Sequence, residues 1–198
     1  MEIFKRNYNF EIRANEDKEN KNYTLTGRPI VYNSKTDLGY FDEIIEAGAL
    51  DKANLKDVCF LVNHDTNRIP LARATEGNKE STMRFSVDKN GMEISVELDV
   101  ENNSEARALY SAVQRGDITG MSFMFTVDGE EWGNLESKHP TRHIKSIGQV
   151  FEVSAVTFPA YEASEISARD KKSLDDAVNK ARTNDLDLLK LKAKYIYN

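Results

Sequence analysis

The chain has few of the residues and runs that mark secreted, membrane or disulfide-stabilised proteins. Its single cysteine, Cys59, lies in an apolar run and cannot form an internal disulfide, so we expect a buried structural thiol in a reducing compartment. No apolar run approaches the roughly 18 residues that a membrane-spanning helix needs. The opening residues, Met1 to Arg6, lack the apolar segment of a secretory signal. We therefore expect a soluble protein that works away from membranes.

Signatures of metal and phosphate binding are missing as well. The chain has 3 histidines, no HExxH motif and no pair of closely spaced cysteines. His139 and His143 match no common zinc spacing, and Gly27 and Gly39 are isolated rather than part of a phosphate-binding loop. The net charge of −6 gives no support for nucleic-acid binding through phosphates. The sequence thus predicts no metal, no cofactor and no nucleic-acid partner.

Local patterns predict one hairpin and one helix. Residues 83–87 and 92–98 alternate between apolar and polar and flank a connection that ends in Asn-Gly, which suits a tight turn with positive φ. Residues 103–115 instead place apolar side chains at helical spacing. Asn103 or Ser104 can cap the start of this helix, and a glycine follows its end.

Many short strands without regular βαβ alternation predict a mainly β fold with helices, of the α+β class. A β-barrel or sandwich decorated with helices fits better than a parallel doubly wound sheet. A short helix is expected at residues 47–55. A single domain at residues 1–169 is expected to precede a charged helical or disordered tail at residues 170–198, which is dense in lysine and acid.

His64 follows a strand-like run that begins at Val58. If the strand continues that far, His64 shares a face with Phe60 and Val62, where a partly dry imidazole suits general-base work near pH 7. A surface histidine beside Asp65 is the alternative interpretation.

Ser122 lies just after Gly120, at the start of an aromatic-rich strand pattern. It shares a strand face with Met124 and Thr126, and the small glycine leaves room for a substrate backbone. The residue can be a nucleophile, or an ordinary exposed serine at a strand end.

Glu152 lies in a third strand-like run. A carboxylate on that apolar face needs a partner, because burying it unpaired is costly. The partner can be the Nδ1–H of His64 or, alternatively, the guanidinium of Arg142. A serine, a histidine and an acid on three strands are the parts needed for nucleophilic acyl transfer.

Five segments carry a resemblance to one family: Leu25–Asn33, Glu43–Leu50, Leu61–Asp65, Arg115–Phe123 and Glu152–Tyr161. In this order and spacing, from about residue 8 to residue 169, the chain resembles the prohead maturation proteases of tailed bacteriophages. Leu50 stands where the family usually has phenylalanine.

The resemblance implies a serine endopeptidase with an assemblin-like β-barrel surrounded by a few helices, as in the related herpesvirus enzymes. It assigns Ser122 as nucleophile and His64 as general base. Glu152 is the expected third member, with His143 in reserve because the herpesvirus relatives use a second histidine. Backbone amides or Arg142 are the candidate oxyanion donors.

The resemblance also implies where the protein acts and on what. It predicts cleavage of the scaffold, of the N-terminal scaffolding segment of the major capsid protein, or of both, together with self-cleavage. The place is the viral procapsid in the host bacterial cytoplasm, and a homodimer or higher oligomer is expected. The tail at residues 170–198 is a candidate scaffold-binding or self-cleavage segment. The alternatives are a non-enzymatic scaffold or capsid-binding module and, more distantly, a metal-dependent phosphohydrolase.

Overall fold

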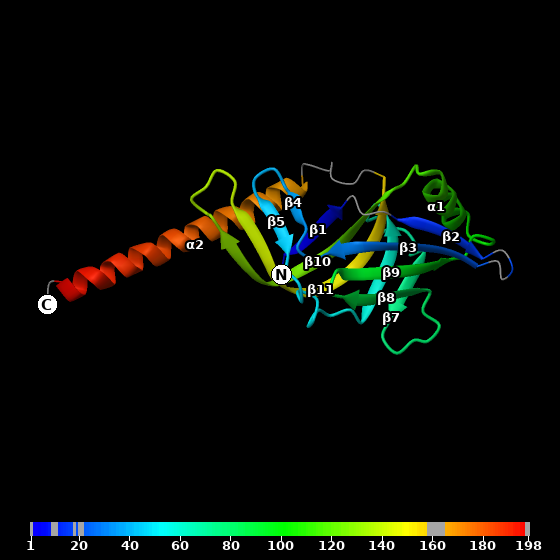
Figure 1. The fold of residues 1–198 in the computed structure, drawn as a ribbon, viewed down its shortest axis with the longest axis horizontal. Coiled ribbons are helices and arrows are strands. Elements are labelled where there is room, and N and C mark those ends of the chain that lie inside the picture. Colours follow the sequence, from blue (N-terminus) through cyan, green and yellow to red (C-terminus); the bar gives the residue numbers. More distant parts are fainter. Residues whose placement is uncertain (1, 9–11, 18, 20–21, 158–164, 197–198) are drawn as a thin grey trace.

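The computed structural model describes residues 2–8, 12–17, 19, 22–157 and 165–196. Its elements, in chain order, are β1 (Ile3–Tyr8), β2 (Arg13–Asp17), β3 (Asn22–Val31), β4 (Lys35–Asp37), β5 (Asp42–Ile45), β6 (Asp57–Val62), β7 (Ala72–Thr75), β8 (Met83–Asp88), β9 (Gly91–Leu98), α1 (Ser104–Arg115), β10 (Gly120–Gly133), β11 (Thr141–Val156) and α2 (Glu165–Ile196). In Figure 1, α1 covers one end of the body and α2 projects from the other.

The strands form two sheets, which confirms a mainly β fold with helices. One is a 7-stranded sheet in the order β1-β10-β11-β5-β4, with β6 paired to β11 and β7 to β6. The other is a 4-stranded sheet in the order β2-β3-β9-β8. The pairing of the described strands leaves both sheets open, so the expected barrel closure is not formed.

The long strand β11 organises the larger sheet. Its first residues, Thr141–Ile144, pair in parallel with β5, and residues 152–155 pair in parallel with β6. Its other edge pairs with β10 in antiparallel fashion along most of its length. Both edges of the second half of β11 are therefore occupied, by β10 on one side and β6 on the other.

The predicted hairpin is confirmed as β8 and β9. On β9 the buried apolar side chains are those of Met92, Ile94, Val96 and Leu98, the alternation expected of a strand with one face on the core. Gly91 has φ +129°, and a Cβ added there would lie 2.0 Å from the carbonyl oxygen of Ile30. Only glycine can occupy this position without moving the backbone of β3.

The predicted helix is confirmed as α1. The Asn103 side chain accepts hydrogen bonds from the amides of Glu105 at 2.9 Å and Ala106 at 3.3 Å, which satisfies two amides of the first turn. Gly116 ends the helix with φ +78°, the left-handed conformation typical of such a cap.

Two local predictions were wrong. Residues 47–55 form successive turns rather than a helix, and Gly48 has φ +85°, which interrupts helical geometry. Cys59 is only partly buried on β6. Burial nevertheless raises the pKa of its thiol, which keeps the sulfur protonated and unreactive near neutral pH.

The second helix, α2, includes residues 170–196 of the predicted charged tail. Asp170 and Ser173 on this helix are buried, whereas Leu186, Leu188 and Leu189 are exposed. Of the helices in the described ranges, none is long and apolar enough to span a membrane.

A buried ionic cluster ties α2 to the larger sheet. Glu43 on β5 accepts hydrogen bonds from Arg6 on β1 at 2.7 Å and from Arg142 on β11 at 3.2 Å. Arg6 also donates to Asp170 on α2 at 2.9 Å, and Arg142 donates to Glu130 at 2.8 Å. Five elements, β1, β5, β10, β11 and α2, therefore meet at this cluster of paired charges.

Candidate active site

His64 is placed by a left-handed turn and not by a continuing strand. Strand β6 ends at Val62, and Asn63 and His64 have φ +51° and +58°. The expectation that the strand continues to His64 is therefore wrong. The Asn63 side chain bonds Thr157 twice, through its amide nitrogen at 3.0 Å and its oxygen at 2.9 Å. These bonds fix the turn against the end of β11.

The turn brings His64 against Glu152. The His64 Nδ1 and Glu152 Oε1 atoms lie 2.5 Å apart, and the two side chains are 7% and 3% exposed. His64 is thus not a surface histidine. Arg142, the other partner considered for Glu152, instead bonds Glu43 and Glu130.

Ser122 lies on the neighbouring strand and faces the same side of the sheet. It is directly opposite Ser154 in the antiparallel pairing of β10 with β11, and Met124 is opposite Glu152. Directly opposed residues project to the same face with their Cβ atoms about 5 Å apart. Ser122 is 0% exposed, so it is not the exposed strand-end serine of the alternative interpretation.

The Ser122 hydroxyl points toward β1 in this structure. Its Oγ donates a hydrogen bond of 2.8 Å to the backbone carbonyl of Arg6. The serine is therefore held between β1 on one side and the strand that carries Glu152 on the other. Among the described residues, Ser122 and His64 form no direct hydrogen bond.

Ser154 is a further polar residue of this site, and its role was not predicted from the sequence. Its hydroxyl donates to Glu152 Oε2 at 2.5 Å and accepts the backbone N–H of His64 at 3.1 Å. The signal in the sequence was its spacing, because residues two apart on a strand share a face.

The reserve residue, His143, lies elsewhere. It is on the first half of β11, and its Nδ1 is 2.7 Å from Glu46 Oε1. Glu152 is nine positions further along the strand, which corresponds to about 30 Å. Arg142, the candidate oxyanion donor, adjoins His143 and is held in the buried ionic cluster. Phe158 to Tyr161, which complete the closing motif, lie outside the described residues.

One group of side chains has the composition of a metal site. Asp37, Asp42 and His139 place three potential ligand atoms within 4.8 Å of one another. His139 Nε2 is 3.2 Å from Asp42 Oδ1, and the Lys35 ammonium pairs with the same Asp42 carboxylate. Mutual ion pairing accounts for this cluster, which lies at β4 and β5 and not beside His64.

Comparison with known families decides the class of protein. The family model described as caudovirus prohead serine protease matches residues 8–178. The chain belongs to this family. Its predicted identity as a serine protease of prohead maturation is thereby confirmed, and the non-enzymatic alternative is not supported.

Curated proteins and solved structures provide two further comparisons. A search of curated proteins finds no match. Among solved structures, the chain is similar to the bacteriophage T4 capsid assembly protease, gp21, with 9% sequence identity and a TM-score of 0.43. The match covers 78% of this chain and 97% of that chain.

The protease has a groove beside the turn at Asn63 and His64, which we call the histidine turn. Its volume is about 440 Å³, and it lies between that turn and α1. Most of its lining is apolar, including Leu61, Leu109 and Ile118, whereas Asp65 and Arg68 contribute charge.

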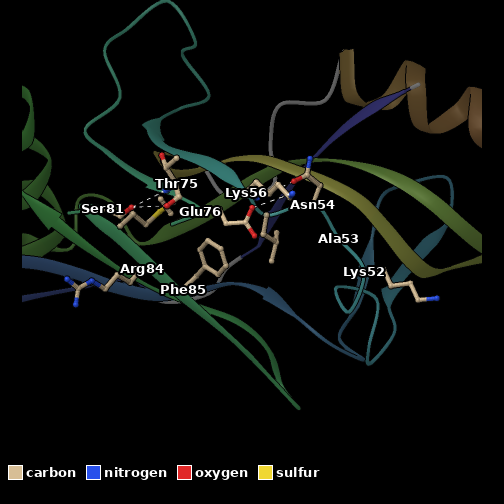
Figure 2. Close-up of a pocket in the computed structure, with 12 residues that line it drawn as sticks. Lys52, Ala53, Asn54, Lys56, Thr75, Glu76, Ser81, Arg84 and Phe85 are labelled. Atoms are coloured by element: carbon tan, nitrogen blue, oxygen red, sulfur yellow. Dashed lines mark hydrogen bonds and ion pairs between the residues drawn. The ribbon is translucent and has the colours of Figure 1, made fainter. Parts of the chain in front are cut away.

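A larger hollow of about 630 Å³ lies at the opposite end of β6 from His64. Figure 2 shows its lining, in which Lys52, Lys56, Glu76, Arg84 and Phe85 take part. None of the three candidate residues lines either hollow. The groove near α1 is the better candidate for holding a substrate because Asn63 and Asp65, the neighbours of His64 in the chain, line it.

Proposed function

We propose that Ser122, His64 and Glu152 are the catalytic triad of this protease. The observation that carries the proposal is the 2.5 Å contact between His64 Nδ1 and Glu152 Oε1, next to a buried serine on the same sheet face. A carboxylate at Nδ1 fixes the imidazole tautomer and stabilises the imidazolium that forms during acyl transfer.

The tautomer follows from this contact. An ionised Glu152 only accepts hydrogen bonds, so Nδ1 carries the proton and Nε2 carries the lone pair. Nε2 is then the atom that takes the proton of the nucleophile. In this arrangement Glu152 orients the base and does not itself transfer a proton.

The reaction begins with a turn of the Ser122 hydroxyl. The Oγ leaves the Arg6 carbonyl by rotation about the Cα–Cβ bond, between staggered rotamers. It then attacks the peptide carbonyl carbon while its proton passes to His64 Nε2. The tetrahedral intermediate collapses when His64 returns that proton to the leaving amine, and the C–N bond breaks.

The acyl-enzyme is resolved by water. His64 takes one proton from the water while the water oxygen attacks the ester carbon. It then returns that proton to Ser122 Oγ as the ester bond breaks. The products are a new carboxylate end and a regenerated serine. No cofactor enters this cycle.

The groove between the histidine turn and α1 is our proposed subsite for an apolar substrate side chain. Asn63 and Asp65 line it and flank His64 directly, so a side chain seated there lies next to the reacting bond. Its charged rim, in which Arg68 bonds Glu105 at 2.6 Å, surrounds an apolar floor. Such a site favours Leu-, Ile- or Met-sized residues over charged ones.

The proposed substrates are the scaffold and the N-terminal scaffolding segment of the major capsid protein, cut inside the procapsid in the host cytoplasm. The proposal extends to self-cleavage and to a homodimer or higher oligomer. We also propose residues 1–169 as the protease domain and residues 170–198 as a scaffold-binding or self-cleavage segment.

The test is co-expression of this chain with the major capsid protein of the same phage. Mass spectrometry reads the N-terminus of the capsid protein with the wild type, with Ser122→Ala and with the matched control Ser95→Ala. A defined truncation that disappears only with Ser122→Ala supports the proposal. Intact capsid protein in all samples, with the chain bound inside the particle, contradicts it.

A further inference from the structure

Ser154 lies where the three parts of the proposed triad meet. On one edge of β11 it is opposite Ser122 of β10, and on the other it pairs with Leu61 of β6, the strand that leads into the His64 turn. Its side chain is 0% exposed. No other residue described in β11 has the strand of the nucleophile on one side and hydrogen bonds to both His64 and Glu152.

The two hydrogen bonds of Ser154 run in a defined direction. A hydroxyl has one hydrogen to donate, and here it goes to Glu152 Oε2 at 2.5 Å. The oxygen accepts the backbone N–H of His64 at 3.1 Å. Donation to an ionised carboxylate is a charge-assisted bond, roughly twice as strong as a neutral one.

These bonds hold both members of the histidine–glutamate pair. Glu152 has one oxygen on His64 Nδ1 and the other on Ser154, so its carboxylate plane cannot turn without breaking a bond. The backbone of His64 has φ +58° and is anchored to Ser154 by its amide. Ser154 therefore fixes the imidazole from two directions.

We propose that Ser154 is a positioning residue of this protease, which holds the His64–Glu152 pair in the geometry that accepts the Ser122 proton. The inference rests on the proposed function of those three residues. It predicts an effect on the chemical step, because a misplacement of a catalytic group by about 1 Å can lower the rate about a hundredfold.

A purely structural role makes a different prediction. A buried backbone amide needs a partner, and Ser154 could serve only to satisfy that of His64. Its loss would then lower the free energy of unfolding and leave kcat of the folded protein unchanged. The two roles separate when kcat and KM are measured on folded protein.

The variants are Ser154→Ala and the pair Ser154→Thr and Ser154→Val. Threonine and valine have nearly the same shape and both suit a strand, so they differ in the hydroxyl alone. Ser146→Ala on the same strand is the control. We expect Ser154→Ala to lower kcat on a capsid-derived peptide by up to about a hundredfold with KM little changed. We expect Ser154→Thr to exceed Ser154→Val in kcat.

A second readout does not depend on activity. Proton NMR detects the His64 Nδ1–H, assigned by its loss in His64→Gln. We expect this resonance to shift in Ser154→Ala and to stay unchanged in Ser146→Ala. An unshifted resonance together with unchanged kcat in Ser154→Ala overturns the inference. If wild-type protein shows no Ser122-dependent cleavage, the proposed function fails, and the resonance alone still decides whether Ser154 holds the pair.

Discussion

His64 and Glu152 are 88 positions apart in the sequence and 2.5 Å apart at their side-chain atoms. The contact depends on parallel pairing of β6 with β11, which places Cys59 beside Glu152, and on a turn that folds the next residues back over that strand. The imidazole is thus aligned by the pairing of β6 with β11 and by the turn that follows β6.

Replacing Glu152 by glutamine should impair catalysis less than removing the nucleophile. The amide is nearly isosteric but loses the negative charge that stabilises the imidazolium and can present N–H to Nδ1. We expect the loss of kcat to be about two orders of magnitude smaller than for Ser122→Ala. Single-turnover cleavage of a capsid-derived peptide measures both. A loss as large as that for Ser122→Ala would mean that Glu152 does more than orient His64.

Asn63 should matter for both stability and activity. Its side chain bonds Thr157 twice, and asparagine tolerates the left-handed conformation at φ +51° better than most residues. We expect Asn63→Ala to lower the free energy of unfolding by about 1–3 kcal/mol, measured by urea denaturation.

A matched control is Asn67→Ala, in the following exposed turn. If Asn63→Ala leaves both stability and cleavage rate unchanged, the turn does not depend on the bonds to Thr157. We expect Asn63→Gly to keep part of the stability, because glycine adopts positive φ without strain.

Filling the groove beside α1 should weaken substrate binding. Ala108 and Ala112 line it on the helix side. We expect Ala108→Leu to raise KM about threefold or more with little change in kcat, since the added methyl groups occupy space meant for a substrate side chain. Gln114→Leu, an exposed position on α1 outside the groove, is the control. Equal KM values in both variants would exclude the groove as the subsite.

The ionic cluster should respond unequally to the loss of its two buried acids. Burial alone would raise the pKa of Glu43, but Arg6 and Arg142 bring it below its ordinary value of 4.5. Burial raises the pKa of Asp170, and Arg6 offsets only part of that rise. We expect Glu43→Gln to destabilise the fold by about 3–5 kcal/mol and Asp170→Asn to destabilise it less.

The two acids also differ in the sign of their pH dependence. The lowered pKa of Glu43 contributes stability above pH 4.5 that is lost as the pH falls through its folded-state value. The raised pKa of Asp170 contributes stability at low pH that is lost as the pH rises through its folded-state value. We therefore expect the penalty of Asp170→Asn to be smaller at pH 7 than at pH 4. A penalty that grows with pH would contradict this assignment.

The features predictable from the sequence are those set by neighbouring residues. The hairpin follows from alternation around Asn90 and Gly91, and α1 follows from its apolar spacing and its caps. The family could be inferred because its motifs are contiguous. Ser122, His64 and Glu152 could each be proposed because each lies in such a motif.

The features that escaped prediction depend on pairing between distant segments. The alternation of apolar and polar residues gave no sign that β6 stops at Val62. The turn at Asn63 and His64 is held by hydrogen bonds from Asn63 to Thr157, a residue 94 positions away. The role of Ser154 requires knowledge of which strands flank β11. The contact of Arg6 with Asp170 joins residues 164 positions apart, which no local pattern encodes.

The most direct test of the account is covalent labelling of the nucleophile. A fluorophosphonate reacts with an activated serine by loss of fluoride, and intact mass with peptide mapping locates the adduct. We predict one adduct per chain, on Ser122, that is absent in His64→Gln and much slower to form in Glu152→Gln. An adduct on another residue, or no adduct in a preparation that cleaves capsid protein, would contradict the assignment of Ser122.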